Sequence, residues 1–280
     1  MTRTVAACLS ATLRRVALTI TVLALAACST IVKPSAANAD APLPTLSQAE
    51  QGYARVLQRH VNTQGEVDFA ALRDDTSDAG LPALESYLRA IAATPLDALQ
   101  QDTALAANTR LAHMINAYNA LSMYNVIASG IPRTHAGTAK LTFFVLRKFD
   151  IGGKTMSLYA FENDVIRKLG EPRIHFALNC SAVSCPVLPR IPFSASTLDQ
   201  ELDREARAFF ARPENLRIDI AQRTVYFNEI LKFYTEDFTP SHAPSLISYA
   251  QKYSSQTIPA DYATAFTPYD WTVANSQRGK

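Results

Sequence analysis

The sequence lacks several features that would indicate a particular class of protein. It has no run of basic residues and a formal net charge of only +2, so nucleic acid is not an expected partner. The apolar run at residues 16–27 has only 12 residues, too few to cross a bilayer comfortably. Internal repeats and low-complexity segments are also missing, which leaves one sizeable domain with a proper core.

The N-terminus has instead the pattern of a bacterial lipoprotein signal peptide. Three arginines precede the apolar run, whose length suits a signal-peptide core. The run ends in "LAAC", where small residues meet Cys28 at the cleavage point, and this resembles a lipobox. An ordinary secretory signal followed by an accidental cysteine is the alternative. We therefore expect residues 1–27 to be removed and Cys28 to be acylated, which would make the membrane a partner through a lipid anchor.

This interpretation places the mature chain in the bacterial cell envelope. Ser29 after the cysteine is similar to lipoproteins sent to the outer membrane, so we expect the domain at its periplasmic face. Removal of residues 1–27 leaves 24 basic and 25 acidic residues, so the basic excess belongs to the signal peptide. Only Cys180 and Cys185 would then remain unmodified, in a compartment that favours disulfides.

The mature chain divides into a tether and one domain. Residues 31–44 are rich in proline, alanine and small polar residues, so a flexible tether is expected over 28–45. From residue 46 to 280 helical patterns alternate with short hairpins, without βαβ regularity. The pattern predicts an α+β domain of helices packed with short antiparallel hairpins.

Individual elements follow from periodicity and caps. One helical pattern begins after a capping box of Ser47 and Glu50. Further helical patterns occupy about 84–94, 108–129, 157–169, 197–209, 229–238 and 244–253. Extended segments are expected at 66–69, 143–158 with a turn at Gly152 and Gly153, 174–179, 216–220 and 224–228. The longest helix, 108–129, carries the polar stripe His113, Asn116 and Asn119. Asparagine is a poor helix former, so these residues are expected to bond across a packed interface or to serve in catalysis.

Several motifs resemble the family called domain of unknown function 547. They are "INAYNALSMYNVI" (115–127), "SLYAFENDVIR" (157–167), "EPRIHFALNCSAVSCP" (171–186), "FYTEDF" (233–238) and "PYDW" (268–271). The resemblance spans about 104–275. It implies an envelope protein without a settled activity, and it implies a common site in which Tyr118, Glu162 and Asp270 would serve as binding residues.

The segment 173–190, "RIHFALNCSAVSCPVLPR", holds the candidate chemistry. In thiol catalysis Cys180 or Cys185 would be the nucleophile, His175 the base, and Asn116 or Asn119 the orienting group or oxyanion donor. On a straight strand, His175 and Cys180 would be about 16 Å apart and on opposite faces, which favours Cys185. A disulfide between the two cysteines is the alternative, and it would stabilise the fold by roughly 2 kcal/mol. A redox-active pair is also possible, but the two cysteines lack the Cys-x-x-Cys spacing that lowers a thiol pKa. A metal site built from His175 and both cysteines would need a fourth ligand.

Two functions therefore remain open from the sequence. One is a module that binds a small molecule or an envelope peptide in a cleft lined by His175 and the Cys180/Cys185 loop. The other is a cysteine-dependent hydrolase or acyl transferase acting on peptide or amide bonds, of the papain or transglutaminase type. No cofactor or metal is expected, and the sequence does not indicate an oligomeric state or a specific ligand.

Overall fold

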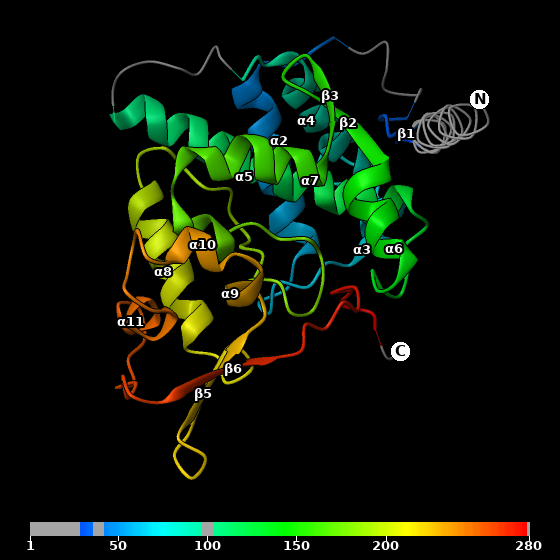
Figure 1. Ribbon diagram of the computed structural model, residues 1–280. Helices are drawn as coiled ribbons and strands as arrows, with labels where there is room; N and C mark the ends of the chain where they lie inside the picture. The colour runs from blue at the N-terminus through cyan, green and yellow to red at the C-terminus, as the bar shows by residue number, and fades with distance from the viewer. Residues whose placement is uncertain (1–28, 36–41, 97–103, 279–280) are drawn as a thin grey trace, which may run out of the picture.

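The computed structural model describes residues 29–35, 42–96 and 104–278 (Figure 1). The expected signal peptide and Cys28 lie outside these residues. Within them, no helix is both long and hydrophobic enough to span a membrane. The structure confirms an α+β fold in a single domain, with small mixed sheets among the helices.

The N-terminal half is mainly helical. Its elements are α2 (Leu46–His60), α3 (Phe69–Asp74), α4 (Leu81–Ala93) and α5 (Ala104–Ala128). Helix α2 packs on α4, and α4 packs on α5. Helix α2 begins two residues earlier than expected, because Thr45 and not Ser47 is the cap. The Thr45 hydroxyl accepts from the Gln48 backbone amide at 3.3 Å, and the Gln48 side chain accepts from the Thr45 amide at 3.1 Å.

The first sheet holds the expected hairpin and one unexpected strand. Its strands are β1 (Thr30–Ile31), β2 (Arg147–Ile151) and β3 (Lys154–Ser157). Strands β2 and β3 are antiparallel and turn at Gly152 and Gly153, both with positive φ, as expected. Residues 143–146, expected to be extended, instead belong to the π-helical turn Thr142–Leu146, which follows α6 (Thr138–Leu141).

Strand β1 falls within the range expected to be a tether. It pairs in parallel with β2, and the Val32 amide donates to Lys148 at 2.8 Å. Three residues after Val32, Ser35 donates to the carboxylate of Glu85 on α4 through its amide and its hydroxyl, at 2.9 and 2.8 Å. The domain therefore holds residues 29–35, and the range available for a flexible tether is shorter than the 28–45 expected.

The second half of the chain builds a smaller group of elements. They are α7 (Leu158–Ala160), α8 (Leu198–Phe210), β4 (Leu216–Asp219), β5 (Thr224–Asn228), α9 (Ile230–Phe233), α10 (Thr235–Phe238), α11 (Leu246–Gln251) and β6 (Ala263–Thr267). The β4–β5 hairpin was expected, whereas β6 was not and lies parallel to β5. Residues 229–238 form two short helices that meet at Tyr234, where one helix was expected. Figure 1 shows α8, α10 and α11 together below α5.

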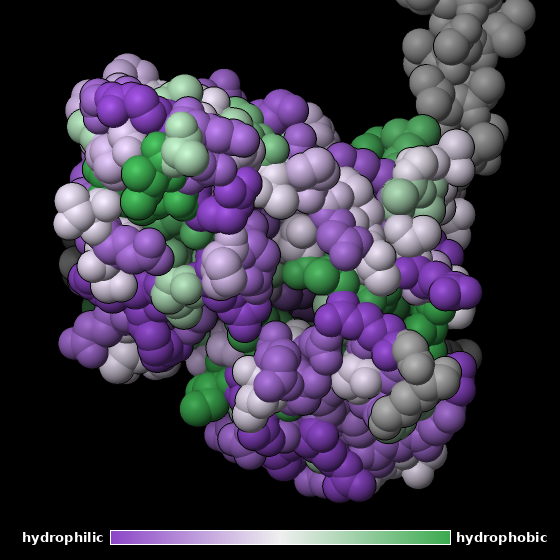
Figure 2. All heavy atoms as spheres, turned by 90° about the horizontal axis from the view of Figure 1, so that it is seen from below, coloured by the Kyte–Doolittle hydropathy of each residue, from purple (hydrophilic) through white to green (hydrophobic). Residues whose placement is uncertain are grey.

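Two hydrophobic cores meet at one short turn. The larger core lies around α2, α4 and α5, and the smaller one around α8, α11 and the β4–β5 hairpin. The turn Pro172–Phe176 contributes Ile174 to the larger core and Phe176 to the smaller one. His175 therefore lies where the cores join. Figure 2 shows that hydrophilic residues cover most of one face, with hydrophobic ones along a hollow that crosses it.

His135 gives the fold a pH dependence that can be measured. Its ring packs at a tilt against Phe143 with centroids 4.0 Å apart, its Nε2 has no hydrogen-bond partner, and burial lowers its pKa to about 4. Because the unfolded value is about 6.5, the folded state is favoured above that pH and loses about 3 kcal/mol as the pH falls towards 4. We expect His135→Gln to flatten this part of the curve in urea unfolding from pH 7 to 4.

The exposed His242 provides the matched control. His242→Gln is expected to retain the pH slope of the unmodified protein. An unchanged slope in His135→Gln would show that His135 is not the group responsible.

Candidate functional site

The polar side chains of α5 form hydrogen bonds with distant segments of the chain. Helix α5 is buried on every side between Leu111 and Val126, so its polar side chains need partners inside the protein. The Asn116 amide exchanges two hydrogen bonds with the backbone of Phe193, at 2.9 and 2.8 Å. The Asn119 amide accepts from the Asn179 backbone at 2.7 Å and donates to the Ala177 carbonyl at 3.0 Å.

The stripe continues at the same three-residue spacing beyond the expected residues. The Ser122 hydroxyl contacts that of Ser181 at 3.3 Å, and Asn125 donates to the Phe143 carbonyl at 3.0 Å. The expected first member, His113, has both ring nitrogens buried without a hydrogen bond. Asn116 and Asn119 use their amides on the backbone and do not line the pocket described below, so the catalytic roles expected for them gain no support.

His175 lies on a helical turn, and the strand expected at 174–179 is wrong. Pro172 starts a 3₁₀ turn, and the Glu171 carboxylate caps it by accepting from the Arg173 amide at 3.0 Å. The extended backbone beyond the turn is held by Asn119 and has no neighbouring strand in the described residues. Hydrogen bonding from another element, which short-range periodicity cannot report, decides the conformation here.

The imidazole of His175 is fixed by an acid that sequence reasoning missed. Its Nε2 lies 2.7 Å from Oδ2 of Asp237, and its ring stacks on Tyr234 with centroids 3.9 Å apart. Arg167 binds both oxygens of Asp237 at 2.6 and 2.8 Å. Burial favours a higher pKa for Asp237, but the bonds from His175 and Arg167 outweigh it and hold the pKa below its usual range. The only sequence signal for Asp237 was its place in "FYTEDF".

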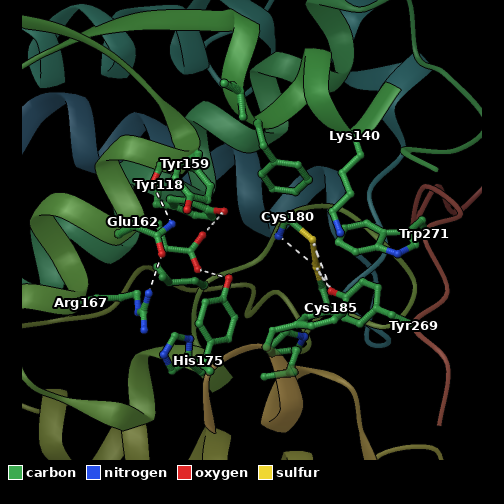
Figure 3. A pocket seen from close by; sticks show the side chains of 18 of the residues that line it. Tyr118, Lys140, Tyr159, Glu162, Arg167, His175, Cys180, Cys185, Tyr269 and Trp271 are labelled. Atoms are coloured by element: carbon green, nitrogen blue, oxygen red, sulfur yellow. Dashed lines mark hydrogen bonds between the residues drawn. A yellow bond between two sulfur atoms is a disulfide. The ribbon is translucent and has the colours of Figure 1, made fainter. Parts of the chain in front are cut away.

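A pocket of about 680 Å³ opens beside this group. Side chains from distant parts of the chain line it, as Figure 3 shows: Tyr118, Lys140, Tyr159, Glu162, Arg167, His175, Cys180, Cys185, Tyr269 and Trp271. Tyr118, Glu162, His175 and both cysteines were expected at one site, and all five line this pocket. Asp270 was also expected there, but it lines a second cavity on the other side of Cys185, where its carboxylate accepts from the Thr272 amide at 2.9 Å.

Glu162 is a buried carboxylate held by two phenols. Its side chain accepts from Tyr118 at 2.8 Å and from Tyr234 at 2.5 Å, and the residue is only 6% exposed. Burial, followed by the Glu162 charge, raises the pKa of both tyrosines above the usual value. The phenols therefore stay protonated and act as donors to Glu162.

Cys180 and Cys185 form a disulfide, as one of the sequence interpretations expected. The Tyr269 hydroxyl donates to the Cys185 sulfur at 3.1 Å, and the Cys180 amide lies 3.0 Å from the same sulfur. The C-terminal segment fixes the loop between the cysteines, because Ala182 pairs with Val273 and the Val183 amide donates to Thr272 at 2.8 Å. Neither sulfur is available as a nucleophile in this state.

Aromatic rings surround the other end of the pocket. Tyr269 and Trp271 lie 4.4 Å apart between centroids, and Phe233 lies within 6.3 Å of both. The Lys140 ammonium lies 3.8 Å from the centre of a Trp271 ring, within the range of a cation–π contact. In the described residues no group of three or more histidine, cysteine, aspartate or glutamate side chains is arranged to hold a metal ion.

Comparison with known proteins connects this geometry to one family. Residues 103–210 match the family described as "Protein of unknown function, DUF547". The match runs from α5 through α8 and includes Glu162, His175 and both cysteines, whereas Asp237 and the aromatic end of the pocket lie beyond it. No curated protein and no solved structure matches the chain. The expected resemblance is thus confirmed over 103–210, and it provides no activity.

The Asp237 cluster can be tested through stability. We expect Asp237→Asn to lower the free energy of unfolding at pH 7 by about 2 kcal/mol, because His175 and Arg167 lose a charged acceptor. Glu236→Gln is the control, since its carboxylate binds the same guanidinium but is 80% exposed. Its effect should stay below about 0.5 kcal/mol in the same urea titration. Equal losses in both variants would contradict this assignment.

Proposed function

We propose that the domain binds a small molecule or a short envelope peptide in the pocket between Glu162 and Trp271. The observation that carries the proposal is the buried Glu162 carboxylate at the wall of a cavity of about 680 Å³. Cavities of this size, with apolar walls and a few fixed polar groups, are typical of small-ligand sites. The pinned disulfide loop supports binding, because it gives the pocket a rigid wall.

A cysteine-dependent hydrolase or acyl transferase is the second candidate. Its support is the pair His175–Asp237, in which a carboxylate orients an imidazole that lines the same pocket as both sulfurs. Asp237 would then fill the orienting role that the sequence assigned to Asn116 or Asn119. This chemistry requires reduction of the disulfide, since only a free thiolate can attack a carbonyl carbon.

We also propose that Cys28 carries a lipid anchor and that the domain faces the periplasm from the outer membrane. The supporting pattern is "LAAC" after a short apolar run. Strand β1 begins at Thr30, two residues after the cysteine, so the anchor would hold the domain close to the bilayer.

The pocket contains the single tryptophan of the chain, and this residue reports on binding. We expect a pool of di-, tri- and tetrapeptides to shift the emission of Trp271 in the oxidised protein. Glu162→Gln should weaken the response at least tenfold, whereas Asp164→Asn, an exposed acid two residues away, should leave it unchanged.

Thiol titration in denaturant without reductant accompanies this measurement. No free thiol at positions 180 and 185 is expected in the protein that binds. Reactive thiols at these positions, together with cleavage of the peptides, would favour the hydrolase. Absence of both an emission shift and cleavage across the pool would reject both candidates.

The anchor predicts the effect of one substitution. Cys28→Ser should move the protein from the membrane fraction to the soluble fraction, because the acylated sulfur is lost. Cys8→Ser is the matched control, since Cys8 lies within the expected signal peptide. Retention of Cys28→Ser in membranes at the level of the unmodified protein would overturn the anchor.

A further inference from the structure

We propose that the pocket selects a zwitterionic ligand, whose ammonium group binds Glu162 and whose carboxylate binds Lys140. A short peptide with free ends is the chemical class that fits. This inference rests on the proposed binding function and adds the charge pattern of the ligand. It is based on two side chains of opposite charge, Glu162 and Lys140, on the wall of one pocket. Neither has an ion-pair partner in the described residues.

Glu162 provides the anionic end. Its two hydrogen bonds come from neutral phenols, and a carboxylate has further acceptor positions beyond these two. Arg167 lines the same pocket, but its guanidinium is used by Asp237 and Glu236. A buried charge without a counter-ion costs free energy, which an incoming cation would recover. The ligand group opposite Glu162 is therefore an ammonium or a similar cation.

Lys140 provides the cationic end. Aromatic rings hold its ammonium, 3.8 Å from the centre of Trp271 and 5.3 Å from that of Phe233. Burial lowers the pKa of Lys140, and Glu229 opposes this shift from a distance. The carboxylate of Glu229 is itself paired with Lys232 at 3.0 Å. Lys140 is thus a positioned cation without a carboxylate partner of its own among the described residues, which suits recognition of an anion.

The two ends are separated across the pocket. Figure 3 shows Glu162 on one side and Lys140 on the other, with the Cys180–Cys185 disulfide between them. A ligand that reaches both must carry its charges at opposite ends of an intervening body. That body would lie against the disulfide and the ring of Tyr269. A peptide spans roughly 3.5 Å per residue, so peptide length can be matched to this separation.

The test uses calorimetry with the series Ala-Ala, Ala-Ala-Ala and Ala-Ala-Ala-Ala, which carry charges only at their ends. For the best length, a lactyl group replaces the N-terminal alanine to exchange the ammonium for a hydroxyl, and a C-terminal amide removes the carboxylate. We expect each change to weaken binding roughly tenfold or more. Calorimetry avoids a readout that depends on Trp271, which Lys140 contacts.

Charge-neutral variants assign each end of the ligand. Glu162→Gln should bind the lactyl and the unmodified peptides about equally, and Lys140→Gln should do the same for the amide and the free acid. Asp164→Asn and Lys154→Gln, both at exposed positions, should retain full discrimination. Lys140 lies on the surface-exposed helix α6, so its variant tests the inference even if Glu162→Gln does not fold.

The outcomes separate this inference from the proposed function. If a peptide that carries both the lactyl group and the C-terminal amide binds as tightly as the free peptide, the zwitterion inference is wrong and the binding function stands. If no alanine peptide binds while members of the wider pool shift Trp271 emission, the lactyl and amide changes are made to a pool peptide that binds, and unchanged affinity after both changes shows that the inference is wrong. If discrimination is lost in the expected variants alone, the inference is supported.

Discussion

The site depends on hydrogen bonds from the buried helix α5 to neighbouring segments of the chain, above all to the loop backbone at Phe193 and Asn179. Asn116, Asn119, Ser122 and Asn125 project from α5 at three-residue intervals and bind segments around residues 193, 178, 181 and 143. A buried backbone group without a partner costs about 1–3 kcal/mol, so the bonds from Asn116 and Asn119 stabilise the loop backbone that they contact inside the fold. The loop that carries Cys180 keeps its position relative to Tyr118 because both belong to this arrangement.

The residues around His175 hold its side chain in a fixed place at the wall of the pocket. Ile174 and Phe176 enter different cores, so the imidazole between them cannot move without disturbing both. Arg167 joins the segment after α7 to α10 through Asp237, which also binds His175. Rigid support of this kind is what a preorganised binding or catalytic group requires.

Local signals in the sequence were sufficient for much of this architecture. The presence of α5 and the turn at Gly152 and Gly153 follow from periodicity and turn chemistry, although α5 begins at Ala104, four residues before the expected start. The disulfide was one of the alternatives that the two close cysteines left open. The strand expected at 174–179 failed because Asn119, far away in sequence, supplies the hydrogen bonds that a neighbouring strand would have made. Asp237 and Lys140 were missed for a related reason, since only tertiary packing brings them to the pocket.

The early strand β1 has a consequence for how the pocket would meet its surroundings. It starts at Thr30 and is locked to β2, so with acyl chains on Cys28 only Ser29 would separate the attachment point from the sheet. So short a connection would allow the domain much less rotation relative to the membrane than a long flexible linker would. The opening of the pocket would then keep a constant orientation relative to the membrane surface. Molecules that diffuse along the lipid surface would therefore approach it from a different direction than molecules that arrive from bulk solvent.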